Sequence, residues 1–334
     1  MPSEIAHSPA FLDALRALLR DWSLALFDPD SGGFRFNAGT GPTVMSTTDV
    51  VWIRYAINDP EPGAPDSGKI VRYLLGMQDP RTGLVRHDPA PPGRMHGDGH
   101  AFWQTVRTLR ILGAPIPRFP AWQAPLRSPA GMDEWFGRFD WDRSAKPPRG
   151  NHHHEVLGLI PMIVSVGDGE LVEALFRNVE KQQNPSTGTW PRPKTEISRT
   201  FAYTCLHMAA GKLPKCPEGI VDEILRLQNA DGLWDEGLPQ FRTMDSAYLL
   251  VRLPPLIRHR EADAIAALEK LSEAMRRAFA EEQGCILTDT HRTLAVTHTF
   301  GLLQEAFPGE YPSERPFRFD WDKLEMYDCA GATF

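Results

Sequence analysis

Acidic, imidazole and guanidinium side chains recur along this chain, each group at the start of an apolar segment with helical periodicity. Carboxylates and neutral imidazoles are the groups that proteins use for general acid and base catalysis, and arginine pairs with carboxylates. Such groups together suit a polyhydroxylated or anionic ligand, because several donors and acceptors must replace its hydration shell. The candidates are Asp49, Asp98, His100, Asn151, His152, His154, Glu155, Arg199, Arg242, Asp245 and His291.

The densest of these groups is Asn-His-His-His-Glu at positions 151–155. On a helix, Asn151 and Glu155 share one face with His152 beside Glu155, whereas His153 should turn away. The dipole at a helix N-terminus disfavours imidazolium. We therefore expect neutral imidazoles, the form needed by a general base or a metal ligand, at His100, His152, His154 and His291.

Three chemistries fit these residue types. In a β-elimination lyase, an arginine or amide neutralises a uronate carboxylate, a neutral histidine abstracts the adjacent proton, and a tyrosine protonates the leaving oxygen. The candidates for binding the carboxylate are Arg199, Arg242 and Asn151. The candidate bases are His100 and His154, and the candidate acids are Tyr203 and Tyr248. In a glycoside hydrolase, two carboxylates act as acid and base. They would be drawn from Asp49, Asp98, Glu155 and Asp245.

The third chemistry is a divalent metal site. Its ligands would come from His96, His100, His152, His154, His291 and Asp245. Only His96 and His100 have the local i, i+4 spacing that two ligands on one helix need. We predict no resident cofactor and leave a metal as an alternative. Trp52 and Trp103 could stack on a sugar ring or on an isoprenoid.

A structural interpretation stands beside these, because aspartate is a good helix N-cap and anions are stabilised at helix N-termini. Asp49, Asp98 and Asp245 could serve as caps alone. A protein that binds a sugar or another protein without turnover is therefore a further alternative.

A repeat must position these groups. Glycine-containing turns recur roughly 50 residues apart, a period that holds two helices and their connections. The segment before each glycine is amphipathic, and the segment after it is apolar nearly all round beyond a polar first turn. The glycines are Gly33, Gly83, Gly137, Gly188, Gly232 and Gly284.

Six helical hairpins of this kind predict a single-domain, all-α (α/α)6 toroid over residues 1–314, with outer helices alternating with buried inner helices. The inner helices are expected at 47–57, 97–112, 151–166, 197–210, 243–253 and 291–307. All six inner N-termini should open at one end, where the polar residues gather. Residues 315–334 are expected to close the ring and are given no catalytic role.

Two of the turns, LQNADGLW at 227–234 and QQNPSTGTW at 182–190, resemble the QxxxGxW repeats of terpenoid cyclases and protein prenyltransferase beta subunits. Similar turns occur in six-hairpin glycosidases, such as unsaturated glucuronyl hydrolases, and related toroids are polysaccharide lyases. Residues 151–155 are similar to a stretch of some toroid lyases in which the asparagine binds a uronate carboxylate. The resemblance implies the toroid and leaves these chemistries open.

Two motifs of the isoprenoid enzymes are missing. The chain has no DxDD acid motif, and Ala247 stands where the zinc-binding Asp-x-Cys pair of the prenyltransferases has its cysteine. A carbohydrate-active lyase or hydrolase, acting on a uronate-containing sugar, is therefore the preferred prediction. A terpenoid cyclase or prenyltransferase-like enzyme is the alternative.

The net charge of −7 over 334 residues leaves no basic face for a phosphate backbone, so we expect no nucleic-acid partner. No apolar run is long enough to span a membrane, and the N-terminal segment carries acids and arginines where a signal peptide is apolar. We expect a cytoplasmic protein whose partner is a small molecule or an oligosaccharide.

Overall fold

The computed structural model describes residues 10–86, 97–116, 118–138, 152–191, 195–329 and 331–334. Within these residues the secondary structure is helical, with four isolated bridges and no extended strand. The all-α class predicted from the sequence is therefore confirmed. No helix of the described part is long and apolar enough to cross a membrane.

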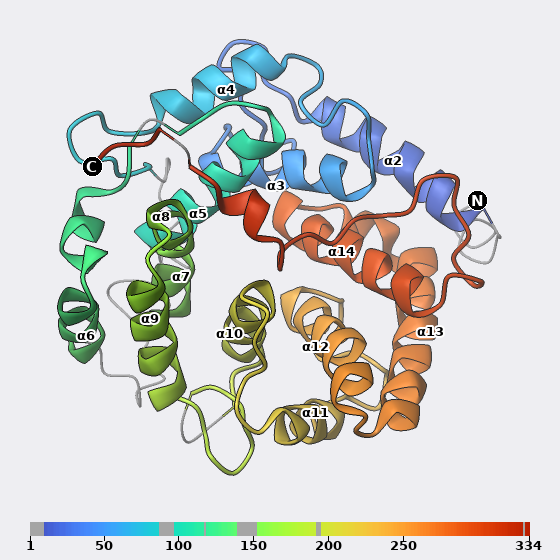
Figure 1. Ribbon diagram of the computed structural model, residues 1–334. Coiled ribbons are helices and arrows are strands. Elements are labelled where there is room, and N and C mark those ends of the chain that lie inside the picture. The colour runs from blue at the N-terminus through green and yellow to red at the C-terminus, as the bar shows by residue number, and fades with distance from the viewer. Residues whose placement is uncertain (1–9, 87–96, 117, 139–151, 192–194, 330) are drawn as a thin grey trace.

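One set of helices forms a closed cycle. Each of α3, α5, α7, α10, α12 and α14 packs against the next, and α14 packs against α3. Figure 1 shows them around a common centre, with a second set of helices towards the periphery. The central set is α3 (Val44–Ala56), α5 (Asp98–Ile111), α7 (His152–Leu157), α8 (Ile160–Val166), α10 (Ile197–Ala209), α12 (Phe241–Ile257) and α14 (Thr290–Ala306). The peripheral set is α2 (Phe11–Ala25), α4 (Ser67–Gly76), α6 (Pro129–Gly137), α9 (Gly169–Lys181), α11 (Pro217–Arg226) and α13 (Glu261–Ile286).

The third inner segment differs from its prediction as one helix, because α7 and α8 are separated at residues 158–159. Pro161 is in the first turn of α8, where its missing N–H costs no hydrogen bond. Gly158 packs against Gly99 of α5, and a Cβ at position 158 would lie 2.5 Å from the Gly99 Cα. The break therefore lies where two helix backbones come close together.

Two of the six predicted turn glycines are not in turns. Gly137 is the last residue of α6, and Gly284 lies inside α13. The helix α6 extends as far as Gly137, and α13 continues through Gly284, since a single glycine costs a helix only about 1 kcal/mol. In the first unit the left-handed residue is Gly32 and not Gly33.

The glutamines of the repeat join neighbouring units. The Gln78 side-chain amide donates to the Gly83 carbonyl at 3.0 Å and to Arg118 at 2.8 Å. The amide of Gln228 likewise donates to Gly232 and Ala267, at 3.0 and 2.9 Å. Only glycine suits these turn positions, because the backbone there has a positive φ and lies against a neighbouring carbonyl group. At Gly83 a Cβ would be 2.3 Å from the carbonyl oxygen of Phe119.

The C-terminal segment, residues 315–334, crosses the C-terminal ends of the central helices. The backbone N–H of Arg318 donates to the carbonyl of Ala56 at the end of α3, at 2.7 Å. The Nε–H of Arg110 in α5 donates to the carbonyl of Glu325 at 3.2 Å, and the backbone N–H of Cys329 donates to the Ser165 hydroxyl in α8 at 3.2 Å. The segment includes the short 3-10 helix η2 (Leu324–Tyr327). In Figure 1 this red segment passes across the middle of the molecule to the C-terminus.

Candidate functional site

A cavity of about 310 Å³ lies among the N-terminal halves of the central helices. Helices α5, α7, α10, α12 and α14 all contribute to its wall, and the C-terminal segment contributes one tryptophan. The lining residues are His100, Trp103, Gln104, His153, His154, Leu157, Ser198, Phe201, Ala202, Asp235, Gln240, Phe241, Arg242, Asp245, His291 and Trp321.

The polarity of the cavity changes with depth. Gln240 and Arg242, at the start of α12, are exposed and form part of the rim. The side chains of Trp103, Phe201 and Trp321 are buried and meet one another, with ring centroids 5.3 Å apart for the two tryptophans and 5.7 Å apart for Phe201 and Trp321. The cavity therefore has a polar rim and an aromatic floor.

Asp245, in the second turn of α12, is a buried carboxyl group on the cavity wall. Burial raises its pKa well above the ordinary value for aspartate, a nearby Asp235 carboxylate adds to this, and a hydrogen bond with the Ser198 side chain acts in the opposite direction. Desolvation dominates because the charged form has lost its water. Burial therefore favours the protonated form of Asp245, which can donate a proton.

Asp235 lines the same cavity but has a structural task. Its Oδ2 accepts the backbone N–H groups of Gln240, at 2.8 Å, and Thr243, at 2.9 Å. These bonds hold the chain at the start of α12, where the first N–H groups have no partner within the helix. The role of helix cap therefore falls to Asp235 here and not to Asp245.

His291 and Asp49 form a second polar pair. The Nδ1–H of His291, in the first turn of α14, donates to Oδ2 of Asp49 on α3 at 3.2 Å. Asp49 is fully buried and also accepts from the Thr290 hydroxyl at 3.1 Å. A carboxylate that holds one ring nitrogen fixes the tautomer and the direction of the other nitrogen. His291 lines the cavity and lies against Phe241, with ring centroids 4.2 Å apart and the ring planes tilted by 36°.

Three further histidines form one wall. The ring of His154 lies 4.6 Å from that of His100 and 4.1 Å from that of His153. All three line the cavity. The expectation that His153 turns away is wrong, because the helix α7 presents two consecutive side chains to the same space.

Several predicted residues lie elsewhere in the described structure. Glu155 accepts the backbone N–H of Gly99 at 3.0 Å, at the start of α5. Asp98, the first residue of α5, does not line the cavity. The buried Tyr248 donates to Asp322 of the C-terminal segment at 3.2 Å, on the far side of the floor. The cavity therefore does not bring these three candidates together with Asp245 and His291.

Three of the predicted ligand-binding residues, Asp49, Trp52 and Arg199, are also buried and do not line the cavity. Arg199 pairs with Glu196 at 3.1 Å. Trp52 packs under the floor, where its ring lies 3.7 Å from the guanidinium carbon of Arg107. Asn151, His96 and the side chain of His152 lie outside the described residues. Of the predicted ligand-binding residues, Trp103, Arg242 and His291 line the cavity.

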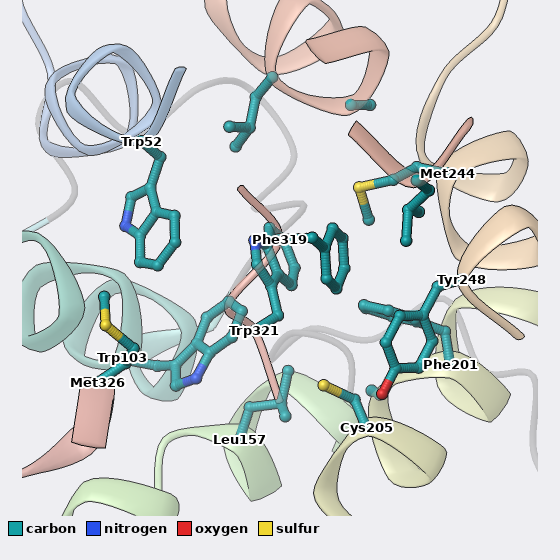
Figure 2. Packing of buried hydrophobic residues seen from close by; sticks show 14 of the residues in the cluster. Trp52, Trp103, Leu157, Phe201, Cys205, Met244, Tyr248, Phe319, Trp321 and Met326 are labelled. Atoms are coloured by element: carbon teal, nitrogen blue, oxygen red, sulfur yellow. The ribbon is translucent and has the colours of Figure 1, made fainter. Parts of the chain in front are cut away.

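Trp321 is the functional candidate that the sequence analysis missed. It lies in the segment to which only ring closure was assigned, yet its indole lies at the centre of the aromatic cluster in Figure 2. The signal that could have found it is the pentapeptide RFDWD, which occurs at 138–142 and again at 318–322. A motif that follows the predicted turn glycine Gly137 and recurs beyond the sixth hairpin is unexpected for a plain C-terminal tail.

No group of three or more histidine, cysteine, aspartate or glutamate side chains in the described residues is arranged to hold a metal ion. No model of a known protein family matches the chain, and a search of curated proteins found no match either. The function must therefore be argued from the site itself.

Proposed function

We propose that the chain is an (α/α)6 toroid whose cavity carries out acid–base chemistry on a uronate-containing carbohydrate, by β-elimination or by hydrolysis. The closed cycle of central helices supports the toroid. The observation that carries the chemistry is that a buried neutral acid, Asp245, and an aspartate-supported histidine, His291, line the same cavity.

In the β-elimination, His291 is the base. Its Nε2 takes the proton next to the carboxylate of the uronate, while Asp49 stabilises the imidazolium that forms. The exposed guanidinium of Arg242 binds the carboxylate and stabilises the negative charge that develops on it. The electron pair then forms a carbon–carbon double bond, the bond to the leaving oxygen breaks, and Asp245 protonates that oxygen. Solvent returns the proton from His291 to Asp245.

Hydrolysis uses the same groups differently. Asp245 protonates the glycosidic oxygen, and His291 activates a water molecule that attacks the sugar. The aromatic floor supports either version, because a sugar ring stacks on tryptophan and phenylalanine by its apolar face.

A second candidate function rests on the floor alone. A carboxylic acid above Trp103, Phe201, Phe241 and Trp321 could protonate an isoprenoid double bond, and aromatic faces stabilise a carbocation. This is a terpenoid cyclase type of chemistry. The polar rim favours the carbohydrate.

The test is incubation with uronate-containing polysaccharides and oligosaccharides, followed by unsaturated-uronate absorbance and by reducing ends. Absorbance with new ends indicates elimination, and new ends alone indicate hydrolysis. We expect His291→Gln to lower the rate by about 100-fold, the contribution of a general base. His259→Gln is the matched control, because His259 pairs with Asp222 away from the cavity. No turnover by the wild-type protein, together with conversion of isoprenoid diphosphates, would contradict the carbohydrate proposal.

A further inference from the structure

The cavity ends at the aromatic floor, to which Trp321 contributes its indole. Below it lies a second, smaller space of about 10 Å³, lined in part by Cys205, Leu206 and Tyr327. The two spaces share five lining residues: Trp103, Leu157, Phe201, Ala202 and Trp321. The lower space has room for about one water molecule. Of the shared residues, only Trp321 comes from outside the ring of helices.

Trp321 is fixed in place by directed hydrogen bonds. Its indole N–H donates to Nε2 of His298 at 2.9 Å, and the Nδ1–H of His298 donates to the Leu294 carbonyl at 3.0 Å. Burial lowers the pKa of His298 to about 3, so the imidazole stays neutral and keeps its acceptor nitrogen. The Tyr327 hydroxyl donates to the Trp321 carbonyl. The indole is therefore part of a rigid wall.

A buried cation supports the wall from below. The guanidinium carbon of Arg107 lies 4.4 Å from the Trp103 ring, 4.8 Å from the Trp321 ring and 5.4 Å from the Tyr327 ring. Its side-chain nitrogens have no hydrogen-bond partner among the described residues. Aromatic faces stabilise this charge by cation–π attraction, and the negative charge of Asp320 acts in the same direction. Moving Trp321 away would remove one of them.

We propose that Trp321 is the end wall of a blind pocket, so that a ligand enters end-first and its terminal unit stops against the indole. The exposed Gln240 and Arg242 mark the rim, and the C-terminal segment closes the opposite end. A chain cannot pass through such a ring. If the uronate function holds, on which this part rests, the enzyme acts on chain ends and releases one terminal unit at a time.

The depth of the pocket can be measured without turnover. The probes are straight-chain alkanoates of increasing length, with the carboxylate at Arg242 and the tail directed to the floor. Each methylene buried in apolar surroundings raises affinity severalfold, by about 0.8 kcal/mol. Calorimetry on the wild-type protein should show affinity rising with chain length and then reaching a plateau. In Trp321→Ala we expect the plateau about three methylene groups later, because an indole has been replaced by a methyl group.

The controls separate depth from folding. Trp321→Phe keeps an aromatic wall and should leave the plateau near its wild-type position. Trp135→Ala removes an indole that stacks on Trp122 outside the cavity, and it should leave the plateau unchanged. If Trp321→Ala does not fold, Trp321→Leu carries the same test. A plateau at the same length in the wild type and in the folded Ala or Leu variant, or no alkanoate binding at all, overturns the proposal.

The second arm uses uronate oligosaccharides of defined length. Terminal units should be the first products at every chain length, and early products from the middle of the chain would overturn the end-first inference. An alkanoate plateau that moves in Trp321→Ala, with no uronate turnover, rejects the proposed function but keeps the blind pocket. The two failures are therefore distinguishable.

Discussion

The two ends of the ring of central helices bury charged groups in different ways. At the N-terminal end, Asp245 is buried beside an open cavity, and burial raises its pKa because the charged form has lost its water. At the C-terminal end, Arg107 is buried under the floor and lies against the faces of Trp52 and Trp103. Burial lowers the pKa of Arg107 as it raises that of Asp245. Only Asp245 adjoins space in which a ligand could exchange a proton with it.

Burial alone does not distinguish a functional group from a structural one. Both side chains carry perturbed pKa values, which are common at functional sites but also occur in structural networks. The two side chains differ in what lies next to them: Asp245 adjoins a cavity with a polar rim, whereas Arg107 is packed against aromatic rings. Substitutions at the two ends should therefore separate activity from stability.

The largest effect is expected at Asp245. Asp245→Asn keeps the size of the side chain and removes the proton donor, so turnover should fall by about 100-fold to 10,000-fold. The measurement is the rate on whichever uronate substrate the panel identifies, with circular dichroism to confirm the fold. A variant that retains the wild-type rate would remove Asp245 from the mechanism and leave the two ends equally structural.

The same substitution gives a pH dependence. Because the folded-state pKa of Asp245 is raised, the folded protein holds the proton more tightly than the unfolded chain does. Its contribution to stability is full below the unfolded pKa of about 3.9 and is lost as pH rises through the folded pKa. Thermal unfolding should show Asp245→Asn gaining relative to the wild type as pH rises above about 4. A difference in stability that is constant with pH would contradict the neutral acid.

The second effect is on stability at the floor. Arg107→Ala removes the cation–π contacts and leaves a cavity among aromatic rings, and we expect the free energy of unfolding to fall by about 3 kcal/mol. Arg242→Ala is the matched control at the mouth: an exposed arginine should change stability by less than about 0.5 kcal/mol while weakening binding of anionic ligands. Chemical denaturation measures both. Equal losses of unfolding free energy from the two substitutions would contradict a structural role specific to Arg107.

The smallest effect is expected at His298, which links helix α14 to Trp321 in the floor. His298→Phe keeps a ring at this position but leaves the Trp321 N–H buried without its acceptor. Such a loss costs about 1–3 kcal/mol in unfolding free energy. The alkanoate plateau should stay at the wild-type length, because the indole remains in the wall. Wild-type stability in this variant would show that the hydrogen bond does not fix Trp321.

Much of the helical framework could be predicted from the sequence, because its signals are local. Apolar periodicity gives helices close to the observed α10, α12 and α14, and the repeated glutamines and glycines of the turns link neighbouring units. The failures were local as well. Gly137 is still the last residue of α6, Gly284 lies inside α13, and Gly158 with Pro161 divides the third inner segment.

The site was only partly predictable. The first-turn residues His100, Arg242 and His291 follow from the position of helix starts, and they do line the cavity. Glu155 has the same kind of sequence signal, yet its carboxylate lies at the start of α5. Asp49 was grouped with them, and its place is behind His291. Sequence spacing gives the end of a helix but not the direction in which a side chain points when two helices meet.

The all-α class, the alternation of amphipathic and apolar segments, and the set of ionisable residues at the helix starts all follow from the amino-acid sequence. Which of those residues share a cavity depends on packing, as does the position of Trp321, 76 residues after Asp245 in the chain, in the floor of that cavity. Helix formation follows from contacts within a few residues. The depth of a cavity and the protonation of a buried acid depend on groups that only packing brings together.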